Sequence, residues 1–373
     1  MSNRFEVDRE PAPEHGTAQA PAQLDTGAEP RRRTRSRRVL LVAVLIMVLL
    51  VPGSMGAYLF SLATIYDTQT TKIEEAFPPE AARVQSPATP AGVPKPMNIL
   101  VMGSDSRDKA ERKASAKAAA GASSDQRADT LMLLHIPSDR DHIYSISLMR
   151  DLWVDIPGRG EAKINAALAF GGVPLMVQTV ESLLQQRIDH VVSLDFAGFK
   201  GLTDALGGVE VDVKVPFSSV RGDKTYVFNK GLNTLNGAQG LAFVRERYAF
   251  PDGDYQRVRN QQSYLRAIMA KTFDGGTLGN PVTLARVLRA VSPFLSVAPG
   301  LDSIEVGRLA FSLRDLRSRD TIFFTLPTAG VGRSADGQSI VLPDVGAIEE
   351  IKAALTEDRL GGYVAARKLG RGN

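Results

Sequence analysis

A run of 28 residues without a charged side chain, residues 39–66, is the feature that most constrains this chain. It exceeds the length of about 20 apolar residues that a helix needs to cross the hydrocarbon core of a bilayer. Residues 31–38, directly before it, include six arginines. Because basic residues flank membrane helices on the cytoplasmic side, we expect residues 1–38 in the cytoplasm and every later residue outside the cell membrane. The pattern therefore predicts a single-pass type II membrane protein.

A cleavable signal peptide is the alternative interpretation of the same run. The apolar part of a signal peptide is shorter, and a long tail does not normally precede it. Pro52 and Gly53 interrupt the run, but membrane helices tolerate both residue types. We therefore expect a retained signal anchor.

The residues on either side of the anchor differ in composition and divide the chain into parts. The N-terminal residues are rich in Pro, Ala, Gly and acids, which predicts disorder, and a Pro-rich run before Met97 predicts an extended spacer. The predicted parts are a cytoplasmic tail with its basic flank (1–38), the transmembrane anchor helix (39–62), a Pro-rich stalk (63–96), one globular domain (97–360, with its core motifs in 97–270) and a flexible C-terminal tail (361–373).

Short apolar runs alternate with helical patterns throughout the globular part. Strands are expected over residues 97–103, 127–136, 143–158, 188–196, 209–217 and 320–327. Helices are expected over residues 163–172, 173–186 and 197–208, from about 236 onward, and over 258–273, 281–298, 302–317 and 344–356. Residues 109–124 contain few large apolar groups, which predicts a mobile surface loop. The alternation predicts an α/β fold, a single α-β-α domain with a central mixed sheet.

One stretch of this domain, residues 244–262, concentrates arginines. Its charged side chains are Arg245, Glu246, Arg247, Asp252, Asp254, Arg257 and Arg259, and Gln261 follows them. Four guanidinium groups this close repel one another unless acids or a polyanion balance them, and arginine binds phosphate through two parallel hydrogen bonds. A solvated charged surface is the alternative. Because apolar and aromatic residues separate the arginines, the pattern favours an anion-binding site.

The sequence lacks the motifs of several enzyme classes. It has no G-x-x-x-x-G-K-[ST] phosphate loop, no G-x-S-x-G and no H-E-x-x-H, and its four histidines show no metal-ligand spacing. Because there is no cysteine, disulfides, thiolate metal sites and a cysteine nucleophile are excluded. Many arginines with a few carboxylates and no strong nucleophile fit phosphoryl transfer, in which catalysis is mostly positioning and charge neutralisation.

Two acids at the ends of predicted strands are candidate metal ligands. Asp105 and Asp129 lie near Arg107 and Arg127 in the sequence. Carboxylates together with phosphate oxygens are the usual ligands of Mg²⁺ in proteins, and Mn²⁺ is an alternative ion. A capping or ion-pairing role is the alternative for each acid, and capping of a helix is the alternative for Lys163.

Eight sequence blocks between residues 97 and 270 carry a resemblance to a known family. In chain order they are NILVMGSDSR, RADTLMLLHI, ISLMRDLWVDIPG, KINAALAFGG, IDHVVSLDFAGF, LTDALGGVEVDV, LNGAQGLAFVRER and DYQRVRNQQ. This series resembles the LytR-CpsA-Psr family, also called the cell-envelope-related transcriptional attenuator domain. The resemblance implies one membrane helix followed by an extracytoplasmic α/β domain. It also implies a transferase that moves a glycopolymer from a polyprenyl-pyrophosphate carrier to peptidoglycan and forms a phosphodiester bond.

The resemblance also implies roles for individual residues. The implied Mg²⁺ ligands are Asp105 and Asp129. The implied catalytic residues are Arg150, Arg245 and Asp254, the last either to orient the arginines or to serve as a base. The residues implied to bind the pyrophosphate are Arg107, Arg127, Arg150, Lys163, Arg245, Arg247, Arg257 and Gln261. Arg259 and Asp252 gain no such role, and we expect them to be surface charges.

Two positions depart from the family pattern. Met149 stands where the family commonly has proline before Arg-Asp. The loop between Asp105 and Asp129 is longer than usual. Neither departure removes a charged residue of the expected site.

The resemblance implies three partners and excludes one. The lipid-linked glycopolymer, peptidoglycan and the membrane are expected partners, and nucleic acid is not. Arabinogalactan, teichoic acid and capsule-type polymers all fit the residues. The helices over residues 166–184 could line a groove for the polyprenyl tail, although core packing is the simpler role. The alternative functions are a pyrophosphatase of such lipids, a non-catalytic lipid or glycan binder, and a regulator that binds nucleic acid, which the expected topology opposes.

Overall fold

The computed structural model describes residues 32–86, 92–104, 128–274, 276–277 and 279–369. The chain divides into two compact units, Met1–Ala57 and Tyr58–Asn373. The predicted disordered residues 1–30 and the predicted loop 109–124 lie outside the described residues.

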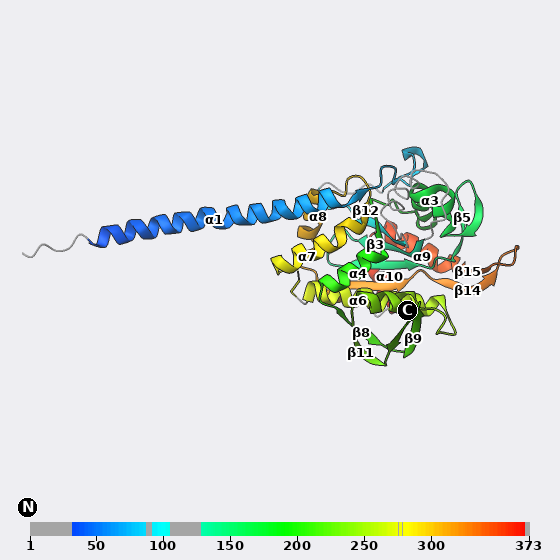
Figure 1. Cartoon of the computed structure of the whole chain (residues 1–373). Coiled ribbons are helices and arrows are strands. Elements are labelled where there is room, and N and C mark those ends of the chain that lie inside the picture. The colour runs from blue at the N-terminus through cyan, green and yellow to red at the C-terminus, as the bar shows by residue number, and fades with distance from the viewer. Residues whose placement is uncertain (1–31, 87–91, 105–127, 275, 278, 370–373) are drawn as a thin grey trace, which may run out of the picture. The chain divides into compact units, whose positions relative to one another are not determined.

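Helix α1, Arg32–Gln69, contains the long apolar run (Figure 1). Two described helices are long and apolar enough to cross a membrane, the part Val39–Gln69 of α1 and helix α3, Ala166–Leu184. More than half of the apolar window of α3 is buried inside the protein, whereas none of the window in α1 is buried. Helix α3 is therefore a core helix of the second unit, and the described side chains of residues 39–57 remain exposed.

A seven-stranded mixed sheet forms the centre of the second unit (Figure 1). In spatial order its strands are β1 (Thr71–Lys72), β12 (Leu295–Val297), β7 (His190–Asp195), β2 (Met97–Ser104), β3 (Ala128–Ile136), β4 (Ile143–Leu148) and β13 (Thr321–Thr325). The pairs β1–β12, β2–β7 and β4–β13 are parallel, and the other neighbours are antiparallel. The predicted mixed α/β fold with a central mixed sheet is thus confirmed.

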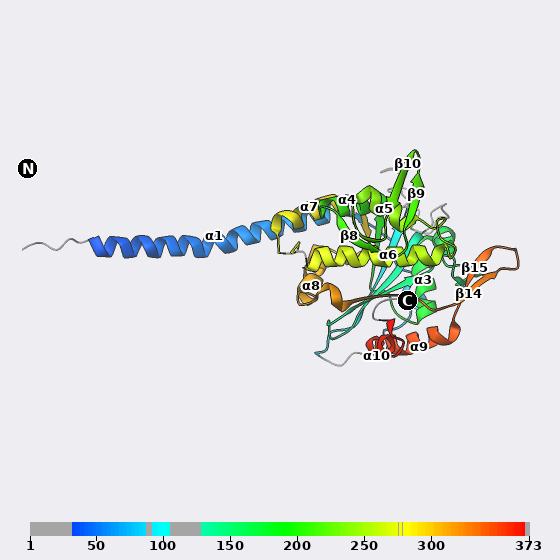
Figure 2. The same cartoon turned by 90° about the horizontal axis from the view of Figure 1, so that it is seen from below.

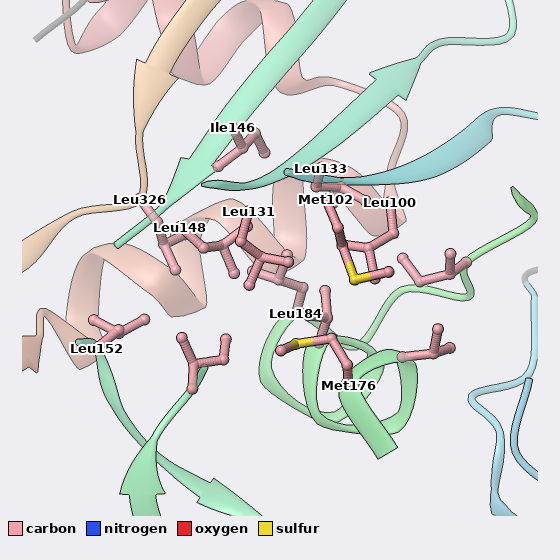
Figure 3. Packing of buried hydrophobic residues seen from close by; sticks show 14 of the residues in the cluster. Leu100, Met102, Leu131, Leu133, Ile146, Leu148, Leu152, Met176, Leu184 and Leu326 are labelled. Carbon is pink, nitrogen blue, oxygen red and sulfur yellow. The ribbon is translucent and has the colours of Figure 1, made fainter. Parts of the chain in front are cut away.

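Side chains that alternate along the strands pack on different helices. Figure 3 shows Leu100, Met102 and Leu131 on the side of the sheet that meets Met176 and Leu184 of α3. Helices α9 (Val345–Thr356) and α10 (Leu360–Ala366) contribute buried residues to the same cluster. The alternate residues of the strands form a second cluster with residues of the chain's later part. Its members include Ile99, Val101, Leu134, Ile136, Ile143 and Val192 from the strands, and Met269, Leu309, Leu313 and Leu316 from the later part.

A smaller layer beside the sheet carries the arginine-rich stretch (Figure 2). It contains the antiparallel pair β8–β11 (Val209–Val213, Gly231–Leu235) and, between these strands in the chain, the hairpin β9–β10 (Phe217–Arg221, Lys224–Phe228). Helices α4 (Phe196–Ala205), α5 (Gly237–Arg245) and α6 (Asp254–Met269) complete the layer. Phe217, Phe228, Phe243 and Tyr264 form its aromatic core. This core positions the end of α5 and the start of α6, between which the arginine-rich stretch turns.

Several predicted elements differ from the observed ones. The predicted strand 143–158 is divided into β4 and β5 (Trp153–Ile156), because Leu152 N–H bonds to the Met149 carbonyl and closes a turn at Arg150 and Asp151. The predicted helix 281–298 ends at Val291 as α7 (Pro281–Val291), and the predicted helix 302–317 ends at Ser312 as α8 (Ser303–Ser312). The remaining strands are β6 (Gly160–Lys163), which pairs with β5, and the hairpin β14–β15 (Thr328–Arg333, Ser339–Pro343).

The predicted helices 163–172 and 173–186 form most of the single kinked helix α3. Gly171 and Gly172 have non-helical backbone angles within it, and Gly172 has a φ of 66°. Only glycine adopts this left-handed conformation without strain. The kink therefore lies at the boundary that the sequence predicts between the two helices.

Part of the predicted stalk belongs to the folded unit. Strand β1 pairs with β12 at the edge of the central sheet, and Ile73 and Ala76 are buried in the main core. The apolar side chains between the charged residues of this segment explain its burial. At the other end, Leu360 and Val364 of α10 are buried where a flexible tail was expected from residue 361.

Candidate active site

The ends of three central strands bring the first charged residues of the site together. Strands β2 and β3 are antiparallel, so the end of β2 at Ser104 lies beside the start of β3 at Ala128. Strand β4 is antiparallel to β3, so the residues that follow Leu148 reach the same edge. Arg150 Nη1 consequently lies 3.0 Å from Oδ1 of Asp129.

Asp254 is the residue on which three arginines converge. Its carboxylate lies 3.0 Å from Arg257 Nη2, 3.4 Å from Arg150 Nε and 3.7 Å from Arg247 Nη1. Burial by itself raises the pKa of Asp254, but Arg257, Arg150, a hydrogen bond with Asp151 and Arg247 together outweigh burial and hold the pKa below its ordinary value. Asp254 is therefore an ionised group that neutralises the cluster.

The backbone before α6 explains how Asp254 reaches this position. Gly253 has a φ of 44° and forms the N-cap of α6. This left-handed conformation lets the chain turn sharply into the helix. Asp254 then occupies the first turn, where the helix dipole favours a negative charge.

A second acid, Asp151, links two other cations of the site. Its carboxylate lies 3.5 Å from Arg150 Nε and 3.4 Å from Lys163 Nζ. Lys163 is the last residue of β6, which pairs with β5 directly after the Arg150 turn. Arg150 thus contacts the carboxylates of Asp129, Asp151 and Asp254, and the hairpin brings Lys163 to the same place.

Three further predicted residues lie on the helices next to this cluster. Arg257 is almost fully buried, and burial lowers its pKa while Asp254 opposes that shift. Gln261 is buried and donates from Nε2 to the Val244 carbonyl at 3.3 Å, so its amide group joins α6 to α5. The guanidinium carbon of Arg245 lies 4.3 Å from the centre of the Phe196 ring, a cation–π contact at the end of α5.

The remaining predicted residues fall into two groups. Asp105, Arg107 and Arg127 lie outside the described residues. Arg259 and Asp252 form an ion pair with each other, and both side chains are more than 40% exposed. Asp252 lines the same cavity as Arg247 and Asp254, but no ion pair joins it to the three arginines that contact Asp254 among the described residues.

Glu246 is a buried residue whose role the sequence analysis missed. Its Oε1 accepts hydrogen bonds from the backbone N–H groups of Arg247, Tyr248 and Ala249, at 3.0, 2.8 and 3.2 Å. Its Oε2 accepts from Ser219 Oγ at 2.6 Å and lies 3.3 Å from Arg221 Nη2. These partners outweigh burial, so the pKa of Glu246 is below its ordinary value. The carboxylate therefore fixes the loop that presents Arg247.

Gln262 is a second missed residue. Its Nε2 lies 3.1 Å from Ser147 Oγ in β4 and 3.1 Å from Thr325 Oγ1 in β13. It thereby ties α6 to the two strands beside the site. The glutamate between two arginines was a sequence signal for Glu246, whereas no spacing in the sequence indicates the partners of Gln262.

The charged cluster lines a cavity of about 1060 Å³. One part of its wall contains Arg150, Asp151, Lys163, Arg247 and Asp254. The rest of the wall carries the aromatic residues Trp153, Phe170, Tyr248, Phe250 and Tyr255, together with residues of the β14–β15 hairpin that include Asp336, Gln338 and Ser339. The lining of the cavity therefore combines the charged residues of the cluster with aromatic side chains and further polar and charged groups.

Asp129 is a carboxylate of the kind that binds a metal ion whose other ligands come from a bound substrate. Its side chain is 27% exposed while it contacts Arg150. Among the described residues there is no group of three or more acids or histidines that could hold a metal by themselves. Mg²⁺ commonly binds through one or two carboxylates and takes its other ligands from phosphate and water. The donor set thus fits an ion that is completed by a pyrophosphate.

Sequence comparison relates the chain to cell-wall proteins of two bacterial genera. It is 31% identical over 259 residues to a Bacillus cereus protein named polyisoprenyl-teichoic acid–peptidoglycan teichoic acid transferase TagU, covering 68% of this chain and 77% of that protein. It is 30% identical over 286 residues to the cell wall biosynthesis protein LcpA of Corynebacterium glutamicum, covering 66% of this chain and 53% of LcpA. The chain thus spans about half the length of LcpA.

Solved structures share the fold. The crystal structure of Bacillus subtilis TagV superposes with a TM-score of 0.58 and 26% identity, over 71% of this chain and 97% of that one. Protein gbs0355 of Streptococcus agalactiae superposes with a TM-score of 0.60 over 71% of this chain and 88% of that one. Its sequence identity is 23%, so this match shows a shared fold and no more. The profile of the LytR_cpsA_psr family matches residues 62–357. This chain belongs to the LytR-CpsA-Psr family.

Proposed function

We propose that this protein is a membrane-anchored phosphotransferase that moves a glycopolymer from a polyprenyl-pyrophosphate carrier to peptidoglycan. The observation that carries the proposal is the convergence of Arg150, Arg247 and Arg257 on Asp254 at the wall of a large cavity. Membership of a family that includes a named teichoic acid transferase supports the same activity.

The arginine cluster is suited to a pyrophosphate. The four cations of the cluster outnumber its three acids by one, so the cluster keeps a positive charge that a polyanion would balance; the cations are Arg150, Lys163, Arg247 and Arg257, and the acids are Asp129, Asp151 and Asp254. Guanidinium groups bind phosphate oxygens through paired hydrogen bonds and stay charged when buried. Arg245 completes the set at the end of α5. Lys163 extends it through Asp151, and Gln261 braces the helix that carries Arg257. The family resemblance assigns Arg107 and Arg127 to the same pyrophosphate.

The reaction substitutes one oxygen on the phosphorus that carries the glycopolymer. A hydroxyl of peptidoglycan attacks this phosphorus, the bond to the bridging oxygen breaks, and polyprenyl phosphate leaves with the electron pair. The proton of the hydroxyl ends on the departing phosphate. The product is a phosphodiester between the glycopolymer and the acceptor. The arginines stabilise the charge that develops on the phosphoryl and leaving oxygens.

Asp254 serves in this scheme as a positioning residue. Its lowered pKa makes it a weak base, because a carboxylate that three cations stabilise holds a proton poorly. Its distances to the arginines fit the role of fixing where they stand. Orientation of the arginines is therefore the better of the two roles expected for it.

A divalent cation fits the remaining acids. Asp129, with Asp105, would hold Mg²⁺ or Mn²⁺ together with oxygens of the pyrophosphate. The ion would supply further neutralisation of the leaving group.

The wall of aromatic and polar groups suits the saccharide part of the substrates. Sugar rings present apolar faces and hydroxyl edges, which match a cavity with aromatic side chains and a few polar groups. Trp153 lies in this wall and donates from Nε1 to Glu161 at 3.3 Å. The indole is thereby fixed in orientation before a ligand enters.

The exposed apolar part of α1 supports a membrane anchor. Residues 39–57 are long enough to cross the hydrocarbon core at about 1.5 Å per residue. The arginines before them favour a cytoplasmic N-terminus. In this topology the protein is a single-pass type II cell-membrane protein, with the cavity on the extracytoplasmic side and separated from nucleic acid.

The full chain, reconstituted in bilayers with the lipid-linked donor, Mg²⁺ and oligomeric peptidoglycan, tests the proposal. The expected product is the glycopolymer joined to peptidoglycan. Asp129→Ala and Arg245→Ala are expected to abolish it while the thermal unfolding of the domain remains cooperative, and near-normal turnover in both variants would refute the site. Release of free glycopolymer phosphate without a joined product would identify a lipid pyrophosphatase instead.

A further inference from the structure

One face of strand β9 contacts the loop that joins α5 to α6. Phe217, Ser219 and Arg221 of β9 are buried or half-buried and alternate with exposed residues, so the three side chains share the inner face of the strand. Figure 2 shows the hairpin β9–β10 beside α5, and the two are in contact. Because the loop after α5 carries Arg247, this face of β9 supports a segment of the site.

Two kinds of contact attach the loop to β9. The Phe217 ring packs edge-on against the Phe250 ring, with ring centres 4.8 Å apart. Ser219 Oγ donates to Glu246 Oε2 at 2.6 Å, and Arg221 Nη2 lies 3.3 Å from the same oxygen. The loop is therefore held at its first residue, which follows α5, and again near its middle.

Glu246 connects β9 to two side chains of the cavity. Its other oxygen, Oε1, accepts from the backbone N–H groups of Arg247 and Tyr248. The Arg247 guanidinium donates to the Tyr248 hydroxyl at 2.5 Å and lies 3.7 Å from Asp254. One carboxylate thus has Arg221 on one oxygen and the backbone of Arg247 on the other.

The contact with Arg221 restricts how the Glu246 carboxylate can turn. The last torsion of a glutamate side chain has broad energy minima, so the carboxylate rotates unless both oxygens are held. Ser219 and Arg221 hold Oε2 and thereby keep Oε1 directed at the loop N–H groups. Arg221 does not belong to the described lining of the cavity, so it can affect a ligand there only through Glu246 or through its own charge.

We propose that Arg221 is a positioning residue for the pyrophosphate site and acts through Glu246 on Arg247. Loss of Arg221 lets the Glu246 carboxylate turn, loosens the backbone at Arg247 and displaces the guanidinium from Asp254. The inference rests on the proposed function, which assigns Arg247 to the pyrophosphate. It adds a strand outside the described lining of the cavity to the elements that set the affinity of the site.

Binding of inorganic pyrophosphate to the detergent-solubilised full chain tests the proposal without requiring transfer. Titration calorimetry with Mg²⁺ present compares the wild type with Arg221→Met. The variant is expected to bind about 10-fold more weakly, because part of one charge-assisted interaction is lost. Arg221→Lys keeps a cation beside Glu246 and should recover most of the affinity. Cooperative thermal unfolding of each variant shows that the domain is folded.

Lys224 on β10 is the matched control. It pairs with Arg221 in the register of the hairpin and is exposed, and no ion pair joins it to Glu246 among the described residues. Lys224→Met removes the same unit of charge from the same hairpin and should leave the affinity within about twofold, since solvent and salt screen an exposed charge. Equal losses in Lys224→Met and Arg221→Met would show an effect of charge alone and overturn the positioning role.

A double-mutant cycle with Arg247 identifies the path of the effect. In an Arg247→Met background, Arg221→Met should weaken binding by no more than about twofold, because the group that it positions is gone. A full 10-fold loss in that background would overturn the proposal, as would unchanged binding by Arg221→Met alone. A wild type that fails to bind pyrophosphate would instead refute the pyrophosphate site of the proposed function, and this inference with it.

Discussion

Arg257 Nη2 lies 3.0 Å from Oδ2 of Asp254, one turn earlier in the same helix. The carboxylate also lies 3.4 Å from Arg150, which comes from the turn after β4. Arg247, 3.7 Å away, comes from the loop between α5 and α6. One acid thus holds together cations from three separate segments, and their positions depend on its charge.

Asp254→Asn should lower the rate of transfer without weakening donor binding. The substitution keeps the shape but removes the charge that holds three guanidiniums, and a displacement of about 1 Å in a reacting group can cost about 100-fold in rate. Because the site gains positive charge, KM for the pyrophosphate donor should stay equal or fall. Steady-state kinetics measures whether kcat falls while KM for the donor stays equal or falls. Asp223→Asn, in the exposed turn between β9 and β10 and outside the cavity lining, should leave both constants within about twofold.

The ionisation of Asp254 should also contribute to the pH dependence of the free energy of unfolding. Its pKa is lower in the folded protein than its ordinary value. The contribution of ionised Asp254 to the free energy of unfolding is therefore complete above its pKa in the unfolded chain, about 3.9. This contribution is lost as the pH falls through the pKa of Asp254 in the folded protein. Urea midpoints of the wild type should fall more steeply than those of Asp254→Asn below about pH 4.5. A difference between the two proteins that already shrinks near pH 6 would mean that the pKa is raised instead.

The part of the site that could be predicted from sequence consists of residues that are close along the chain or at strand ends. The resemblance assigned both Asp129 and Arg150 to the site, and their contact follows from the antiparallel order of β3 and β4, which the structure shows. The contacts of Gln262 could not be predicted, because its partners Ser147 and Thr325 lie 115 and 63 residues away and its amide side chain has no distinctive spacing. Contacts of this kind depend on how the helices pack on the sheet, which periodicity does not specify.

Burial of charge was harder to predict than its presence. In the sequence Glu246 is one acid among four arginines, and a count of charges treats it like Asp252. The structure buries Glu246 and leaves Asp252 exposed, since only Glu246 meets three consecutive backbone N–H groups. Five strands of the central sheet (β2, β3, β4, β7 and β13), by contrast, followed from apolar runs. The short edge strands did not, because β1 lies in the predicted stalk and β12 in the predicted helix 281–298.

Glu246→Ala should destabilise the domain and loosen Arg247. The substitution leaves Ser219 and three backbone N–H groups without their acceptor and Arg221 without its acid, and about 3 kcal/mol of unfolding free energy should be lost. Glu246→Gln keeps an acceptor oxygen and should cost roughly half as much. Chemical denaturation measures both. The exposed carboxylate of Glu210 in β8 offers a control, because Glu210→Gln should change stability by less than about 0.5 kcal/mol.

Trp153→Ala should weaken saccharide binding and leave chemistry intact. Trp153 lines the aromatic part of the cavity and is held by Glu161. Removal of the ring should raise KM for a glycan-bearing substrate about 10-fold, which is about 1.4 kcal/mol, with kcat within about twofold. Varying donor and acceptor separately identifies which saccharide the wall binds. Trp153→Phe should recover most of the loss, and an effect on kcat alone would contradict the assignment.

Arg83 and Glu181 provide a test of whether the segment before Met97 is part of the domain. Their side chains are only 6% and 1% exposed, and Glu181 Oε1 accepts from Arg83 Nε at 3.1 Å and from the Ile188 N–H at 2.9 Å. Arg83→Met leaves a buried carboxylate without its cation and should cost about 3–5 kcal/mol of unfolding free energy. Adding Glu181→Gln should recover part of that loss, because the buried charge is removed.

The neighbouring pair Arg187–Glu80 is the matched control for this prediction. Its N–O distance is 2.6 Å, but the Glu80 side chain is 66% exposed. Arg187→Met should therefore cost no more than about 1 kcal/mol, the usual range for a surface ion pair. Denaturant titration of both variants compares the two pairs directly. Equal small losses would mean that residues 80–84 form a detachable stalk, whereas a large loss confined to Arg83→Met would make the segment a structural part of the fold.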